Sequence, residues 1–153
     1  MSNFMNFHIT KPNIDLNKYK EGVSRVGFFE GSRYDGNTSV AQVARYNEFG
    51  VPYKVGSRIP KRPFMRPAVE QNKSMLIETL RSEYKRALKN NDDTMLSLQR
   101  FGEYVKGIIQ QQIVNTWEPP NAKSTIERKG RNSPLRDTLL MLNSVSHQEE
   151  EIR

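Results

Sequence analysis

The first apolar segment along the chain is residues 24–29 (SRVGFF), which looks like a β-strand. A turn cluster follows at residues 34–37. Thr38 or Ser39 is then expected to cap a short helix. Gly50 is expected to end that helix in the left-handed conformation that is common after helix C-termini.

Two longer apolar stripes follow, each with the three-, four- and seven-residue spacing of one helical face. Residues 90–92 separate them, and Asp92 or Asp93 is expected to cap the second helix. Pro119-Pro120 prevents its continuation. The short turn predicts an antiparallel helical hairpin whose stripes form the core. The first stripe is Met65, Val69, Leu76, Leu80, Tyr84 and Leu88; the second is Leu98, Phe101, Val105, Ile108, Ile109 and Ile113.

The last third of the chain contains three shorter patterns. Residues 125–130 are compatible with a single helical turn or part of a loop. Ser133-Pro134 predicts the N-cap and first position of a short helix over residues 135–142. Residues 143–147 alternate like a strand, and we place them beside residues 26–29 in an antiparallel sheet.

These elements predict an α+β fold, with a small antiparallel sheet packed with a long antiparallel helical hairpin and short helices. Residues 1–20 have few periodic apolar positions, and we interpret them as an N-terminal arm that forms a strand when it docks. Residues 21–153 are expected to form a single domain, in which residues 51–62 are an irregular loop or a short hairpin.

Composition limits the class of protein. The 153 residues suit about one domain. Only 35% of them are hydrophobic, which predicts a lean core completed by burial against neighbours. There is no cysteine, so disulfides and thiolate metal sites are excluded. The start lacks signal-peptide features and no segment is apolar enough to span a membrane, so we expect a reducing aqueous compartment.

The net charge of +7 is unevenly distributed. Residues 51–90 carry ten Lys or Arg against three Glu, and the rest of the chain is balanced. Basic clusters favour contact with polyanions, although they also occur on ordinary solvated helix faces. A second cluster consists of Lys123, Arg128, Lys129, Arg131 and Arg136, and it is offset by Glu149, Glu150 and Glu151.

Part of this charge lies on a loop that prolines stiffen. Pro60, Pro63 and Pro67 each fix their own φ angle and favour an extended residue before them. Phe64 and Met65 lie between the cations of this loop. A rigid loop with this composition looks exposed, and we expect it to be presented to a phosphate backbone, to another subunit or to the protein's own core.

The chain offers little catalytic chemistry. His8 and His147 belong to no metal-ligand or His-plus-carboxylate spacing. Glu127 and Lys129 have the E-x-K form of some metal-dependent nucleases, but those enzymes need a Mg²⁺-binding carboxylate on a neighbouring strand. We interpret this match as a charged surface turn, and we expect no catalytic, cofactor-binding or metal-binding residues.

Sequence-blind binding of nucleic acid remains open as an alternative. The cations alternate with Phe49, Tyr53, Phe64 and Tyr84, which permits phosphate contact and stacking. However, no zinc-finger, RNP or KH motif is present. A metal-dependent nuclease is a further alternative, on the strength of the E-x-K match alone.

Five segments occur in an order that resembles a known family. They are residues 44–50 (ARYNEFG), 59–68 (IPKRPFMRPA), 119–120 (PP), 125–130 (TIERKG) and 134–138 (PLRDT). Together they resemble the virion morphogenesis, tail-completion and neck proteins of tailed phages, the gp10-like head–tail joining proteins. The resemblance spans roughly residues 22–148.

The resemblance implies a structural, non-catalytic subunit without cofactors. It implies a homo-oligomeric ring of six-fold or twelve-fold symmetry at the head–tail junction, around the DNA channel. Its partners would be other phage neck, connector and tail proteins, with non-specific contact to passing double-stranded DNA and none to a membrane. Assembly would occur in the host cytoplasm, and the final location would be the virion.

The resemblance also suggests roles for individual residues. One departure from the family pattern is Leu139, where the family usually has glycine; Leu-Leu-Met at this point favours a continued helix. Cations expected to be freer to face DNA are Lys54, Arg58, Lys61, Arg128 and Arg131. Matched positions expected at subunit interfaces or in the scaffold are Asn47, Glu48, Phe49, Gly50, Pro60, Arg62, Pro63, Phe64, Arg66, Lys129, Pro134, Leu135 and Asp137.

Overall fold

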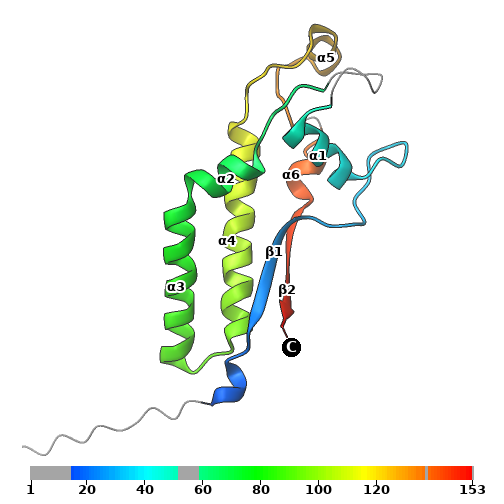
Figure 1. The fold of residues 1–153 in the computed structure, drawn as a ribbon. Coiled ribbons are helices and arrows are strands. Elements are labelled where there is room, and N and C mark those ends of the chain that lie inside the picture. Colours follow the sequence, from blue (N-terminus) through cyan, green and yellow to red (C-terminus); the bar gives the residue numbers. More distant parts are fainter. Residues whose placement is uncertain (1–14, 52–58, 137, 153) are drawn as a thin grey trace, which may run out of the picture.

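A computed structural model describes residues 15–51, 59–136 and 138–152. Their fold is a two-stranded antiparallel sheet combined with helices, which confirms the predicted α+β class (Figure 1). The elements in chain order are η1 (Leu16–Lys18), β1 (Gly22–Phe28), α1 (Val40–Phe49), α2 (Met65–Gln71), α3 (Lys73–Asn90), α4 (Thr94–Asn115), α5 (Lys123–Lys129), α6 (Leu140–Asn143) and β2 (Val145–Glu151).

The two strands pair as predicted, with Val26 opposite His147 and Phe28 opposite Val145. β2 continues to Glu151, further than residues 143–147 suggested. The acidic residues near the C-terminus therefore lie within the sheet, where Glu150 forms an ion pair with Arg25. Ion pairs of this kind between neighbouring strands explain how β2 can contain three consecutive glutamates.

The antiparallel helical hairpin is confirmed for α3 and α4, and α4 lies between α3 and the sheet (Figure 1). Asp93 caps α4, because its carboxylate accepts a hydrogen bond of 2.8 Å from the backbone N–H of Met95. Asn91 makes the turn in the left-handed conformation.

The first long helix is broken, contrary to the single stripe predicted for it. At Asn72 the backbone leaves the helical conformation (φ −108°, ψ 8°), and α3 begins after it. The predicted stripe therefore does not form one continuous buried face across this break. Val69 and Leu88, predicted to be buried, are 46% and 51% exposed, whereas Ala68 and Ala87 are fully buried. These small side chains leave room for the neighbouring helices to approach closely.

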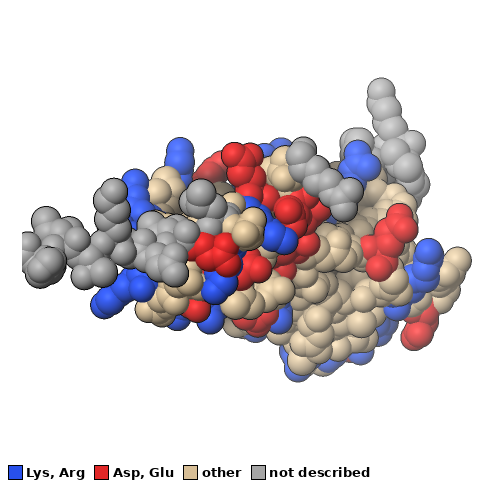
Figure 2. Space-filling model, turned by 90° about the horizontal axis from the view of Figure 1, so that it is seen from below, with Lys and Arg blue, Asp and Glu red and all other residues tan. Residues whose placement is uncertain are grey.

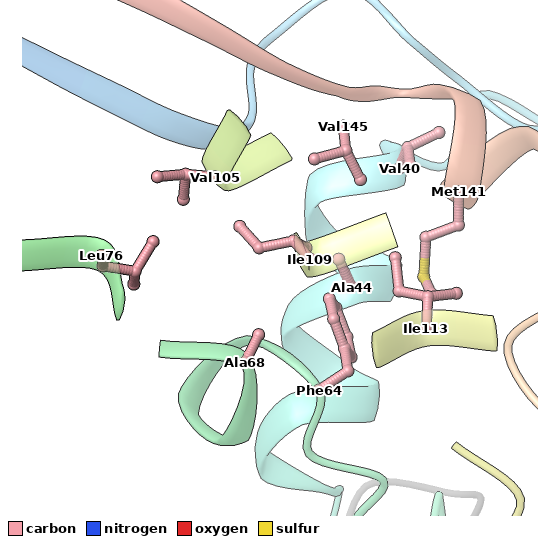
Figure 3. Close-up of a cluster of buried hydrophobic side chains, with 10 residues drawn as sticks. All are labelled: Val40, Ala44, Phe64, Ala68, Leu76, Val105, Ile109, Ile113, Met141 and Val145. Atoms are coloured by element: carbon pink, nitrogen blue, oxygen red, sulfur yellow. The ribbon is translucent and has the colours of Figure 1, made fainter. Parts of the chain in front are cut away.

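One hydrophobic cluster joins six segments of the chain (Figure 3). Phe64 and Ile113 are fully buried in it, and Phe64 also meets the ring of Phe28 edge-on at 6.0 Å between centroids. The buried members are Val40, Ala44, Phe64, Ala68, Leu76, Val105, Ile109, Ile113, Met141 and Val145. The core is therefore centred where α1, α2, α4 and α6 meet the end of the sheet.

The predicted helix over residues 135–142 is wrong in extent. Leu135 and Leu139 both have positive φ angles, of 60° and 61°, and only α6 is helical. Leu139 thus adopts the left-handed conformation that a glycine would take most easily. Residues 125–129 lie within α5 and Gly130 follows its end, in line with the helical alternative.

Gly50 follows α1 as expected, but its conformation (φ 76°, ψ 164°) is not the left-handed helical one predicted. A side chain at this position would lie 3.2 Å from the carbonyl oxygen of Ile59. Val51 and Ile59 form an antiparallel bridge, as in the hairpin alternative, and residues 52–58 lie outside the described residues.

Candidate functional site

The carboxylate of Glu48 organises the start of α2. It accepts hydrogen bonds from the backbone N–H groups of Phe64 (2.7 Å), Met65 (3.0 Å) and Arg66 (3.2 Å). Phe64 is the N-cap residue of α2 and offers no capping side chain of its own. Glu48, at the end of α1, therefore caps a helix whose N-cap residue lies sixteen residues later, and its charge suits the positive end of the helix dipole.

The environment of Glu48 favours its charged form. The side chain is only 3% exposed, and this burial opposes ionisation. The hydrogen bonds from the Phe64 N–H, the Arg66 side chain and the two following N–H groups outweigh that penalty, so the pKa of Glu48 lies below its ordinary value. Glu48 is thus a charged group held in the interior by its donors.

Arg66 completes this arrangement from the solvent side. Its Nε donates to Glu48 Oε1 at 2.9 Å, and its guanidinium also reaches the Glu48 carbonyl oxygen at 3.3 Å. The guanidinium lies 5.1 Å from the centroid of the Phe49 ring. Arg66 is about half exposed, so it braces Glu48 and Phe49 while keeping contact with water.

Arg62 joins the proline-stiffened loop to the segment after α4. Its Nε donates to the carbonyl oxygen of Pro119 (2.7 Å), and one terminal nitrogen donates to that of Pro120 (2.8 Å). Its backbone N–H donates to the carbonyl oxygen of Asn47 (2.7 Å). Burial lowers the pKa of Arg62, and the carbonyl oxygens compensate the charge that burial disfavours.

The expectation that this loop is exposed is wrong for Arg62 and Phe64. Arg62 is 7% exposed and Phe64 is fully buried, whereas Lys61 and Arg66 are exposed. The loop ends against a core that needs Phe64. Glu48, Arg62 and Phe64 were predicted to belong either to the scaffold or to an interface. Their contacts within the subunit favour the scaffold.

The second set of matched positions lies on and after α5. Gly130 ends α5 in the left-handed conformation (φ 68°, ψ 4°). Ser133 and Pro134 are buried, and Leu135 packs against the core. Arg136 lies over the Trp117 ring, 4.2 Å from its centroid. Asp137 falls outside the described residues.

The two sets of matched residues meet at one hollow of about 230 Å³. Arg62 and Asn47 come from the first set, and Leu135 from the second. Its full lining is Tyr34, Val43, Asn47, Arg62, Asn121, Leu135 and Met141. The structure thus brings together segments that are about seventy residues apart in sequence.

The cations expected to face DNA fall into two groups. Lys54 and Arg58 lie outside the described residues, and Lys61 is exposed before α2. Arg128 and Arg131 are exposed, yet each of them already has an interaction partner. Arg128 also lies in the last turn of α5, where a cation suits the helix dipole without any ligand.

Acidic side chains gather on one face of the molecule (Figure 2). Figure 2 shows acidic side chains gathered over the middle of the face that is seen from below, with Lys and Arg scattered around them. Glu151 at the end of β2 forms an ion pair of 2.9 Å with Lys20. The net charge of +7 is thus not spread evenly over the surface.

The nuclease-like pair Glu127 and Lys129 lies on the helix α5 rather than on a strand. Among the described residues, no group of three or more His, Asp or Glu side chains could hold a metal ion. His8 lies outside the described residues.

Sequence reasoning missed a polar cluster around His147. Its Nδ1 lies 2.9 Å from Glu149 Oε1, and its Nε2 lies 3.0 Å from Glu103 Oε2. The Ser24 hydroxyl donates to the same Glu149 oxygen at 2.8 Å. The interpretation that His147 has no carboxylate spacing is therefore wrong: residues 147 and 149 share one face of β2, and period-two spacing could have revealed it. Gly102 of α4 makes room, because a side chain there would lie 2.7 Å from Glu149 Oε1.

Within the described ranges, no helix is long and apolar enough to cross a membrane. Comparison of the chain with protein-family models, curated proteins and solved structures gave no match. The site is therefore interpreted from its own contacts and from the ordered motifs of the sequence.

Proposed function

We propose that this chain is a structural subunit of a tailed-phage virion, which forms a ring at the head–tail junction around the DNA channel. The ordered motifs from residue 44 to residue 138 suggest this class of protein. In this proposal the chain has no catalytic role and uses no cofactor. Its partners are further copies of itself and other neck, connector and tail proteins.

The observation that carries the proposal is that the matched residues bind one another's segments within the subunit. Glu48 binds the start of α2, and Arg62 binds the Pro119 and Pro120 carbonyl oxygens. Three separate motif segments thereby form one rigid scaffold. The charged groups of Glu48 and Arg62 are occupied by these bonds, which suits a building block better than a reactive site.

Exposed apolar side chains on the hairpin support assembly. Ile77 and Leu88 lie three helical turns apart, so they are on the same face of α3. Exposed large apolar residues on α3 and α4 are Met75, Ile77, Leu88, Leu96 and Tyr104. Such side chains are typical of surfaces that another protein covers.

Sequence-blind DNA binding by a free monomer is less favoured. Several cations of the basic segment have carboxylate partners: Arg66 pairs with Glu48, Arg81 with Glu78 and Arg86 with Glu83. These pairs reduce the charge that is free for phosphate. A ring that encloses DNA can contact it with lower affinity than a free monomer needs for binding. Non-specific contact with the passing DNA therefore stays part of the proposal.

Native mass spectrometry tests the assembly. We expect the wild-type chain to give one oligomer of six-fold or twelve-fold size, and the Ile77→Asp/Leu88→Asp variant to be a folded monomer, because buried charge is costly at an interface. The control is Ser82→Asp, which adds charge at an exposed polar position about 120° or more around α3 from Ile77 and Leu88, and it should still assemble.

Two results would contradict the proposal. One is a wild-type monomer at high concentration that binds DNA tightly and in a salt-dependent way, which would favour the DNA-binding alternative. The other is Mg²⁺-dependent DNA cleavage that is lost in Glu127→Ala, which would establish the nuclease alternative.

A further inference from the structure

A hollow of about 460 Å³ lies beside the C-terminal half of β1. Five consecutive residues, 25–29, line it, so both faces of the strand contribute. No residue of β2 lines it, which places it on the edge of β1 that faces away from β2. The lining residues are Arg25, Val26, Gly27, Phe28, Phe29, Ala41, Ala44, Arg45, Glu48, Phe49, Met65 and Arg66.

The opposite wall of this hollow is α1, with the start of α2 at one end. Ala41 and Ala44 have small side chains, which leave space between the helix and the strand. Phe49 is 56% exposed, and Phe29 and Met65 add further apolar surface. The hollow therefore suits a chain segment that presents apolar side chains.

The edge of β1 beside the hollow is available for pairing. Among the described residues, β1 pairs with β2 alone. A strand at the edge of a sheet is a template for a further strand, and a sheet of only two strands gains stability from a third. Main-chain hydrogen bonds and side-chain pockets would then act together, as in other cases of strand addition.

The N-terminal arm contains a segment with the required pattern. Met5, Phe7 and Ile9 alternate with Asn6 and His8, so an extended backbone would place the three apolar side chains on one side. No cation or carboxylate interrupts this segment.

The position of Asp15 favours donation of this segment to another copy. Asp15 and Lys18 bind Asn91 at the turn between α3 and α4. This is the opposite end of β1 from α1 and the hollow (Figure 1). Residues 5–9 precede Asp15 by six to ten residues, so an extended chain places them about 20–35 Å from Asp15, which allows them to cross to a neighbouring subunit.

We propose that residues 5–9 of one copy add as a strand to the free edge of β1 in a second copy, with Met5, Phe7 and Ile9 in the hollow between β1 and α1. This inference rests on the proposed ring. One end of each subunit would bind the other end of the next, and such a heterologous contact closes into a ring when the rotation between subunits allows it.

Disulfide trapping tests the contact in the full-length chain, which contains no cysteine of its own. A size-tagged Phe7→Cys copy is mixed with an untagged Ala41→Cys copy and oxidised. We expect a mixed disulfide between the two, because a cysteine pair must approach to about 4 Å between Cβ atoms to form the bond. The control partner is Ser74→Cys, exposed on α3, which should give no mixed disulfide. Circular dichroism of each variant checks that it is folded.

The alternative outcomes are distinct. A disulfide that forms only within a single chain carrying both Phe7→Cys and Ala41→Cys shows that the segment fills its own groove, and it overturns donation to a second copy. No disulfide in a preparation that native mass spectrometry shows to be oligomeric overturns this inference and leaves the ring. No disulfide in a monomeric preparation overturns both.

Discussion

At the scale of single residues, Glu48 is the side chain on which the matched segments depend most. Its carboxylate binds three successive backbone N–H groups and the Arg66 side chain. Phe64, the N-cap residue of α2, makes no capping hydrogen bond with its own side chain. A glutamate is needed here because the acceptor must reach from α1 and carry a charge.

The Glu48→Gln variant should lose about 2–3 kcal/mol of unfolding free energy, since charged hydrogen bonds are replaced and one amide donor would face the N–H groups. Urea unfolding followed by circular dichroism measures this loss. Glu78→Gln is the control: its carboxylate pairs with Arg81 on the surface, and we expect a change below about 0.5 kcal/mol. Equal losses in the two variants would contradict the capping role.

The lowered pKa of Glu48 predicts the pH dependence of stability. Its contribution is fully present above the unfolded-state value near 4.5 and is lost as the pH falls through the lower pKa of the folded state. The stability difference between wild type and Glu48→Gln should therefore be constant from pH 7 to about pH 5 and shrink at lower pH. A difference that stays constant down to pH 3 would argue against a charged Glu48.

Phe64 shows how burial changes the expected outcome of a mutation. Because the ring is fully buried, Phe64→Ala should cost about 3–5 kcal/mol and reduce the fraction folded, rather than give a stable subunit that only fails to assemble. The control is Phe49→Ala, since Phe49 is mostly exposed and its loss should cost less than about 1 kcal/mol. Thermal melts of both variants provide the measurement, and a Phe64→Ala melt like that of wild type would place the ring outside the core.

At the scale of elements, the strands and α4 were predictable because their patterns are local. Residues 24–29 contain Val26, Phe28 and Phe29, and Asp93 precedes a regular apolar stripe. The break at Asn72 was not predictable, because the stripe continues across it at helical spacing. The phase change became visible only in the packing of Ala68 and Ala87 against their neighbours.

The candidate site was predicted as a set of residues, but its geometry was not. The sequence marks Glu48, Arg62 and Phe64 as members of one motif set. It does not reveal that Glu48 caps α2 or that Arg62 binds the Pro119 carbonyl oxygen, since both contacts join distant segments. The charge of Arg62 suggested exposure, and only its carbonyl partners explain how it is buried.

The late start of α6 leads to a further prediction. Leu139 precedes this helix with a φ of 61°, a conformation that costs a non-glycine residue about 1 kcal/mol. Leu139 is 43% exposed, so Leu139→Gly should leave stability unchanged or raise it by up to about 1 kcal/mol. Leu140→Gly, within α6, should lower it. Urea midpoints compare the two, and a clear loss in Leu139→Gly would show that its side chain outweighs the strain.

At the scale of the whole molecule, the subunit has a rigid scaffold and unfinished surfaces. The scaffold joins α1, α2 and the segment after α4. The unfinished surfaces are the exposed apolar side chains of the hairpin and the hollow beside β1. A ring would cover such surfaces with neighbouring copies, which also fits the lean core suggested by composition.

Electron microscopy of phage particles that carry a density-labelled copy of this chain tests the central claim most directly. The account predicts label at the junction of head and tail, arranged around the DNA channel. Label absent from the particle, or found along the tail or over the capsid shell, would contradict it.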